Sequence, residues 1–299
     1  MTPPVSALSK MVGQDPSLPV LSTGHADLVD TPEGDWYAVF LATRPQSPQN
    51  VSGAAQLGRE TFLAPVIWSD DGWPVINSGE PVTLNISDSK LYYLPRQQEW
   101  IDNFDQQELV DNAYYTARTP YRSFHTLAER PGYLRLRGNP YTLSDRETPA
   151  AFFRKQVDLN VVWSTELEFE PQNDRHEAGL SVYLSIHYHN EIAITSRNGT
   201  KAIVTQTRTG PEATFVEEVF PFDSGNATSS VILAIKASAS GYELGYSFSG
   251  EEDIEYVTAV GNVWLQTHLE GWQTFTGTFF GLYATGNGFP ILVPAVNYS

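Results

Sequence analysis

The sequence predicts an all-β protein in two parts: the last blades of a β-propeller over residues 1–95, followed by an antiparallel β-sandwich over residues 100–299. The first observation is that short apolar or alternating runs recur along the chain, with no long amphipathic helix between them. The second is that 20 prolines and 22 glycines break the 299 residues at short intervals. Proline and glycine residues that interrupt the chain so often favour many short strands over long helices.

Before residue 95 the expected strands come in pairs joined by tight turns. An acidic turn over residues 30–35 separates a strand at 27–29 from an apolar strand at 36–42. A second hairpin is expected at residues 64–76, around the turn SDDG at 69–72. A strand, an acidic glycine turn and a strand bearing Trp form a pattern seen in propeller blades. These units are too few for a closed ring.

After a polar connector over residues 86–103, the alternation of polar and apolar residues indicates a second set of strands. They are expected at residues 132–138, 165–170, 178–184, 230–236 and 242–248. Short alternating strands at regular spacing are typical of a sandwich of two sheets.

The charge balance and composition exclude several classes of partner. The chain has 18 Lys and Arg against 35 Asp and Glu, a net charge of −17, so its surface repels phosphate backbones and we expect no nucleic acid partner. No run approaches the roughly 18 apolar residues of a membrane span, so we expect no membrane partner. The absence of cysteine excludes disulfides and thiolate metal sites. The oligomeric state is left open.

Sequons for N-glycosylation favour an extracellular location. They occur at Asn50, Asn85, Asn198, Asn226 and Asn297, although each taken alone is weak evidence. The first residues do not read as a signal peptide, because no charged segment and no apolar segment follow Met1. We therefore expect an exported family whose export signal is not in this chain.

Several runs of sequence closely resemble glycoside hydrolase family 43. They are GHADLV at 24–29, WYAVFL at 36–41 and LGRETFLAPVIW at 57–68. Further along, RSFHTLAERPGYLRLRG at 122–138 and FTGTFFGLY at 275–283 are similar to that family's C-terminal concanavalin-like sandwich. The resemblance implies a five-bladed propeller, and in complete members an inverting β-xylosidase or α-L-arabinofuranosidase that acts on xylo- or arabino-oligosaccharides in xylan degradation.

The resemblance also implies a sugar pocket. His25 matches a histidine at the pocket floor, which in some members helps to hold a divalent cation, and Arg59 matches a pocket arginine. Asp27 and Glu60 are the carboxylates nearest these motifs, and we expect Asp27 on the same strand face as His25. Phe275 lies in the segment that sends an aromatic side chain towards the pocket. Structural roles stay open: a strand cap for His25, a pair of Arg59 with Glu60 or with a neighbouring strand, and a sandwich-core position for Phe275.

No residue is assigned as catalytic. In the family a base Asp, an Asp that tunes the pKa of the acid, and an acid Glu all precede the GHAD run. Here only Asp15 carries a carboxyl group before His25. Because an inverting glycosidase needs two carboxyl groups about 6.5–9.5 Å apart, we expect a truncated relative that is inactive alone. The alternatives are a carbohydrate-binding sandwich module and a non-catalytic structural domain.

Two other groups of residues suit metal ions. Asp102 and Asp105, on either side of Phe104, offer oxygen ligands for calcium, so calcium is kept as an alternative and no cofactor is certain. His187 and His189 are spaced to share a metal ion on one strand face. Without a third ligand nearby in the sequence, an ordinary exposed strand face is the expected structure.

Overall fold

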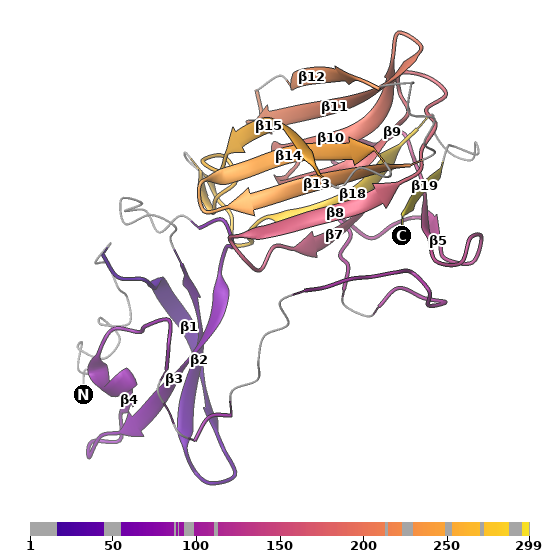
Figure 1. Ribbon diagram of the computed structural model, residues 1–299. Helices are drawn as coiled ribbons and strands as arrows, with labels where there is room; N and C mark the ends of the chain where they lie inside the picture. Colours follow the sequence, from indigo (N-terminus) through magenta and orange to yellow (C-terminus); the bar gives the residue numbers. More distant parts are fainter. Residues whose placement is uncertain are drawn as a thin grey trace. The chain divides into compact units, whose positions relative to one another are not determined.

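The computed structural model describes residues 17–44, 55–86, 88, 90–92, 99–110, 113–212, 215–222, 230–248, 253–269, 272–286 and 295–298. These residues form strands and one short 3-10 turn, η1 (Asn77–Gly79), so the all-β prediction is confirmed (Figure 1). The chain divides into two compact units, Met1–Glu99 with Gln266–Gly277 and Trp100–Leu265 with Thr278–Ser299. No helix among the described residues is long and apolar enough to cross a membrane.

The first unit is built on an antiparallel sheet in which consecutive strands are neighbours, as in a propeller blade. Its strands are β1 (Leu21–Asp30), β2 (Trp36–Thr43), β3 (Glu60–Trp68) and β4 (Pro74–Ile76). The predicted acidic turn joins β1 to β2, and its Gly34 adopts a φ of 88° that favours glycine. The turn between β3 and β4 likewise contains Gly72 at a φ of 78°.

One face of this sheet carries a small apolar core. Ala38, Phe40 and Ala42 of β2 pack with Ala64 and Val66 of β3, and all five are buried. Val20, Val82 and the partly buried Trp36, Phe62 and Ile76 complete this cluster. Because side chains alternate along a strand, the intervening residues of β2 and β3 point to the opposite face.

A segment from the far end of the sequence completes the first unit. Residues 266–277, which contain the short hairpin of β16 (His268–Leu269) and β17 (Trp272–Gln273), group with residues before 100 rather than with the predicted sandwich over 100–299. Thr276 forms an antiparallel bridge with Gly58. The backbone N–H of Ala55 donates to Oγ1 of Thr267 at 3.1 Å. This pairing across more than 200 residues has no local signal in the sequence.

The second unit is a sandwich of two antiparallel sheets, as predicted (Figure 1). The larger sheet has the order β12 (Val216–Pro221), β11 (Thr200–Thr209), β10 (Tyr188–Arg197), β9 (Glu177–Ser185), β18 (Phe279–Thr285), β7 (Ala150–Lys155). The smaller has the order β15 (Glu255–Gly261), β14 (Gly241–Phe248), β13 (Val231–Ser238), β8 (Val161–Leu167). A further sheet contains β19 (Ala295–Tyr298), β6 (Leu134–Arg137) and β5 (His125–Thr126).

The apolar core of the sandwich lies between its two sheets. Leu180 and Ile192 of the larger sheet, and Leu233 and Leu244 of the smaller one, are fully buried. By alternation, Glu191 must point to the opposite face of the larger sheet. That face carries the polar residues described below.

The structure corrects the expectation for the two histidines near residue 188. His187 lies in the two-residue turn between β9 and β10, and His189 is completely buried within β10. The prediction of an exposed strand face is therefore wrong, because nothing in residues 185–188 indicates a hairpin turn.

Candidate functional site

The strand that carries the GHAD run is interrupted twice. Its register with β2 shifts between Leu21 and Gly24 and again between Gly24 and Asp27. Ser22 and His25 adopt φ values of 54° and 56° at these two places. Each shift sets two residues of β1 against one residue of β2, which is the arrangement of a β-bulge. Bulges of this kind re-aim side chains near the edge of a sheet.

The second bulge changes the expected relation of His25 to Asp27. Both side chains are exposed. Two residues apart in a regular strand, they would share a face, but His25 occupies the bulge and Asp27 is back in register opposite Val39. The simple alternation that placed them on one face does not apply, because the bulge adds a residue between them.

Arg59 meets Phe275 in the first unit. The guanidinium carbon of Arg59 lies 3.9 Å from the centre of the Phe275 ring, a cation–π contact. The backbone N–H of Arg59 also donates to the carbonyl of Phe275 at 3.1 Å. Phe275 is 55% exposed, so the alternative of a sandwich-core position is wrong for this residue.

Glu60 has a different partner from the one considered in the sequence. Its carboxylate accepts two hydrogen bonds from Arg44, from Nε to Oε2 and from Nη2 to Oε1, both at 2.7 Å. This bidentate pair holds the carboxylate of Glu60 in one orientation. The bidentate partner of Glu60 is therefore Arg44, a residue that the sequence analysis did not consider.

Asp27 and Glu60 cannot work as an acid and base pair. Asp27 pairs with Val39 of β2, and Glu60 pairs with Ala42. Directly paired residues point to the same face, while Val39 and Ala42, three positions apart, point to opposite faces. The two carboxyl groups therefore lie on opposite sides of the sheet, with β2 between them.

The described residues provide no metal cluster. None of them form a group of three or more His, Asp or Glu side chains that could share an ion. A metal role for His25 thus stays a prediction. Asp102 already binds protein donors, since its carboxylate accepts the N–H of Phe104 at 2.9 Å and the hydroxyl of Tyr114 at 3.0 Å. The calcium alternative likewise stays a prediction.

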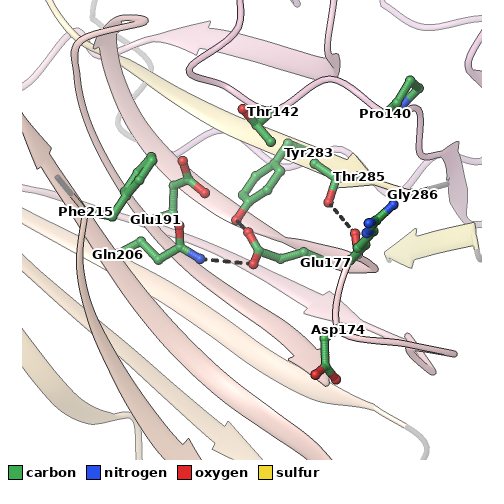
Figure 2. A pocket seen from close by; sticks show the side chains of 11 residues that line it. Pro140, Thr142, Asp174, Glu177, Glu191, Gln206, Phe215, Tyr283, Thr285 and Gly286 are labelled. Atoms are coloured by element: carbon green, nitrogen blue, oxygen red, sulfur yellow. Dashed lines mark hydrogen bonds between the residues drawn. The ribbon is translucent and has the colours of Figure 1, made fainter. Parts of the chain in front are cut away.

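The second unit contains a pocket that the sequence analysis missed (Figure 2). It has a volume of about 330 Å³, and its lining includes Glu177, Glu191, Gln206, Phe215 and Tyr283. Burial, and secondly the charge of Glu191, raise the pKa of Glu177 to about 8. The available signal was a Glu in the middle of β10, a strand buried at every position before Arg197.

Comparisons with known proteins cover both units. Residues 101–295 match the family model described as the beta xylosidase C-terminal concanavalin A-like domain. Residues 3–74 match glycosyl hydrolases family 43. The resemblance found in the sequence is thus confirmed.

Relatives with known names match nearly the whole chain. The non-reducing end alpha-L-arabinofuranosidase BoGH43B of Bacteroides ovatus is 35% identical over 285 residues, which are 91% of this chain and 49% of the relative. The putative beta-xylosidase of Escherichia coli is 28% identical over 283 residues, 90% of this chain and 52% of the relative. The chain therefore spans about half the length of these relatives.

Solved structures agree with these relatives. The chain resembles the Bacteroides ovatus xyloglucan PUL GH43B with a TM-score of 0.81 at 32% identity, covering 94% of this chain and 54% of that one. It resembles the xylan beta-1,4-xylosidase of Bacillus halodurans with a TM-score of 0.83 at 26% identity, covering 94% and 53%. Since the family models match most of its residues, the chain belongs to glycosyl hydrolase family 43 and carries that family's concanavalin A-like C-terminal domain.

Proposed function

We propose that this chain forms the C-terminal part of a family-43 glycoside hydrolase that acts on xylo- or arabino-oligosaccharides, and that it contributes to the sugar pocket without hydrolysing glycosides alone. The observation that carries the proposal is the contact of Arg59 with Phe275 at 3.9 Å. It joins a cation and an exposed aromatic ring at the start of β3, with β2 between this contact and the bulged strand of His25. The names of the relatives, an arabinofuranosidase and a xylosidase, support the substrate class.

Each of these side chains has a physical use in binding a sugar. The planar guanidinium of Arg59 presents several N–H donors in a fixed fork, which suits sugar hydroxyl oxygens. Its contact with Phe275 keeps that fork in one orientation. The exposed part of the Phe275 ring offers an apolar surface to the C–H groups of a sugar. His25 adds a ring nitrogen that can donate or accept a hydrogen bond.

In our proposal Asp27 and Glu60, the carboxyl groups nearest the pocket motifs, do not supply the chemistry. Inverting hydrolysis requires one carboxylic acid and one carboxylate on opposite faces of the scissile bond, about 6.5–9.5 Å apart. Asp27 and Glu60 are separated by the sheet, and Glu60 is held by Arg44. In our proposal the acid and the base therefore come from propeller polypeptide outside this sequence.

The face of the sheet opposite its core is suited to packing against a further propeller blade. Val39, Leu41 and Leu63 on this face are only half-buried. Val29 and Ile67, on the same face, are 42% and 58% exposed. Exposed apolar side chains that share one face of a sheet mark a surface that can pack on another element, and neighbouring propeller blades pack sheet on sheet. The preceding blade of a family-43 propeller is the proposed occupant.

Hydrolysis assays with and without the missing blades test this function. The full chain would be assayed with 4-nitrophenyl β-xyloside and 4-nitrophenyl α-L-arabinofuranoside, alone and fused behind the N-terminal half of a family-43 relative. We expect no nitrophenol release by the chain alone and turnover by the fusion. In the fusion, Arg59→Ala should lower kcat/KM by about tenfold or more, because a charge-assisted hydrogen bond is lost.

The control is a matched arginine in the second unit. Arg146→Ala removes an exposed guanidinium without touching the proposed pocket and should leave turnover of the fusion unchanged. Steady nitrophenol release by the chain alone, abolished by His25→Ala, would contradict the proposal.

An extracellular location also remains a proposal. Of the sequon residues, Asn198 is exposed in the turn between β10 and β11, beside Gly199. A position of this kind is accessible to a glycosyltransferase.

A further inference from the structure

A pocket opens on the face of the larger sheet that points away from the sandwich core. Its walls come from neighbouring strands, with Glu177 on β9, Glu191 on β10, Gln206 on β11 and Tyr283 on β18. In Figure 2 the polar ends of these side chains point towards the same space. Its volume of about 330 Å³ lies at the lower end of the range of small-molecule sites, roughly 300–1,000 Å³.

The first carboxyl group of the pocket is fixed by hydrogen bonds. Oε1 of Glu177 accepts the hydroxyl of Tyr283 at 2.7 Å, and Oε2 accepts Nε2 of Gln206 at 3.1 Å. Nη2 of Arg197 lies 3.8 Å from the same Oε2. This carboxyl group therefore has a defined orientation before any ligand enters, which lowers the entropic cost of binding.

The second carboxyl group is held by a buried histidine. Nδ1 of His189 donates to the carbonyl of Ser185 at 2.9 Å, which leaves Nε2 facing Oε1 of Glu191 at 3.1 Å. Oγ of Ser144 also lies 3.2 Å from this Nε2, so both ring nitrogens of His189 have polar neighbours that hold the ring in place. Glu191 is 5% exposed. The histidine thus orients a carboxyl group whose remaining accessible surface faces the pocket.

An aromatic ring forms the apolar wall. Phe215 is 39% exposed, and its ring centre lies 5.7 Å from that of His189 in an edge-on arrangement. The guanidinium carbon of Arg208 lies 5.6 Å from the same ring centre. These contacts position one ring at the pocket while leaving part of its surface free for a ligand.

The charges of the pocket favour a neutral ligand with several hydroxyl groups. Burial raises the pKa of Glu177 to about 8, so this group is uncharged at neutral pH. The rest of the lining contains both the acidic Asp174 and Glu191 and the basic Arg175, so an anion is not favoured. A cation is disfavoured by Arg197, 3.8 Å from Glu177, and the described residues offer no cluster of metal ligands. Hydroxyl groups can donate to the carboxyl oxygens and to Oε1 of Gln206, whose Nε2 already donates to Glu177 and Glu217. C–H groups can pack on Phe215. This mixture of a few fixed polar groups and one aromatic ring is that of a sugar site.

We propose that this pocket of the sandwich is a second binding site for a neutral sugar unit of about pentose size, recognised by Glu191, Glu177, Gln206 and Phe215. The site lies wholly within the second unit. It does not depend on the proposed glycosidase function and requires no hydrolysis.

Titration calorimetry and NMR of the full chain test the site. The probes are D-xylose, L-arabinose and xylobiose, with calcium chloride as a separate titrant. We expect saturable binding of at least one sugar. Glu191→Gln and Phe215→Ala should each weaken it by about tenfold, because a charge-assisted hydrogen bond and a stacking surface are lost.

Control variants make the result specific. Glu243→Gln changes an exposed glutamate of the smaller sheet, paired with Lys236, and should leave the affinity unchanged. Thermal unfolding checks that Phe215→Ala and Glu191→Gln remain folded. The proposal is overturned if no sugar binds, if calcium binds in place of sugar, or if the affinity is unchanged in both pocket variants. Loss of binding in Arg59→Ala alone would also overturn it, because the sugar would then occupy the first unit.

Discussion

Among single residues, Glu177 carries the clearest consequence for stability. Its side chain is buried between Tyr283 and Gln206, with Glu191 nearby. Burial disfavours the charged carboxylate, and the charge of Glu191 adds to this effect, so the pKa of Glu177 is raised to about 8. The folded protein therefore keeps a proton that the unfolded chain releases near pH 4.5.

This difference predicts that stability falls as pH rises. Below about pH 4.5 the group is protonated in both states and contributes no pH dependence. Between about pH 4.5 and 8 the folded state binds more protons, so the free energy of unfolding should fall by up to roughly 1.4 kcal/mol per pH unit. Urea denaturation at several pH values from 5 to 8 measures how the free energy of unfolding depends on pH. Glu177→Gln should remove the part of this dependence that comes from Glu177.

Three histidines that are buried or partly buried change the stability in the opposite direction, and their effect must be separated from that of Glu177. Burial lowers the pKa of His125, His176 and His187, which raises stability with pH up to about 6.5, the usual value for histidine. The difference between wild type and Glu177→Gln cancels this contribution. Glu243→Gln, at an exposed ion pair, is the matched control. An unchanged slope in Glu177→Gln would refute the assignment.

Among the elements, the returning segment 266–277 depends on two glycines. A Cβ atom at Gly277 would lie 2.2 Å from the carbonyl carbon of Leu57, and one at Gly58 would lie 2.1 Å from the nitrogen of Gly277. Both clashes involve backbone atoms, which cannot rotate away. The close approach brings Phe275 to Arg59, so the two glycines position the proposed sugar-binding contact.

Gly277→Ala should therefore loosen this segment. We expect a loss of about 1–3 kcal/mol in the free energy of unfolding of the first unit, as for other overpacked sites. Faster amide hydrogen exchange in residues 272–277 should accompany it. Gly261→Ala is the matched control, because a Cβ atom there meets no heavy atom within 4 Å, and its effect should stay within about 0.5 kcal/mol. Equal exchange in both variants would show that the close approach is not needed.

Local patterns in the sequence predicted strands of both units. The candidate site, in contrast, is formed by contacts between residues that are far apart in the sequence. Alternation and turn residues predicted β2, the hairpin of β3 and β4, and the strands β9, β13 and β14. The bulge at His25 was not predictable, since no residue in GHADLV demands a positive φ. The pairing of Glu60 with Arg44 and of Gly58 with Thr276 arises only when separate strands meet. Those contacts decide which side chains face a ligand.

At the scale of the whole molecule, the two units differ in how completely they bury apolar surface. The larger and smaller sheets of the second unit cover one another's apolar faces. In the first unit, the apolar cluster covers one face of the sheet, while Val29 and Ile67 stay exposed on the other face. Burial of apolar area is the main favourable term in folding. The first unit should therefore open more often than the second.

Limited proteolysis of the full chain tests this order. Thermolysin should cut first within the first unit, that is within residues 17–99 and 266–277, and should leave the sandwich strands uncut, because cleavage follows the population of the open state. Supplying the remaining blades as a fusion should protect residues 17–99, since they would cover the apolar face. The sandwich strands β9 and β10 serve as the internal reference. Cleavage there at an equal or earlier time would contradict both the stability order and the reason given for it, that an uncovered blade face is the weak point of this chain.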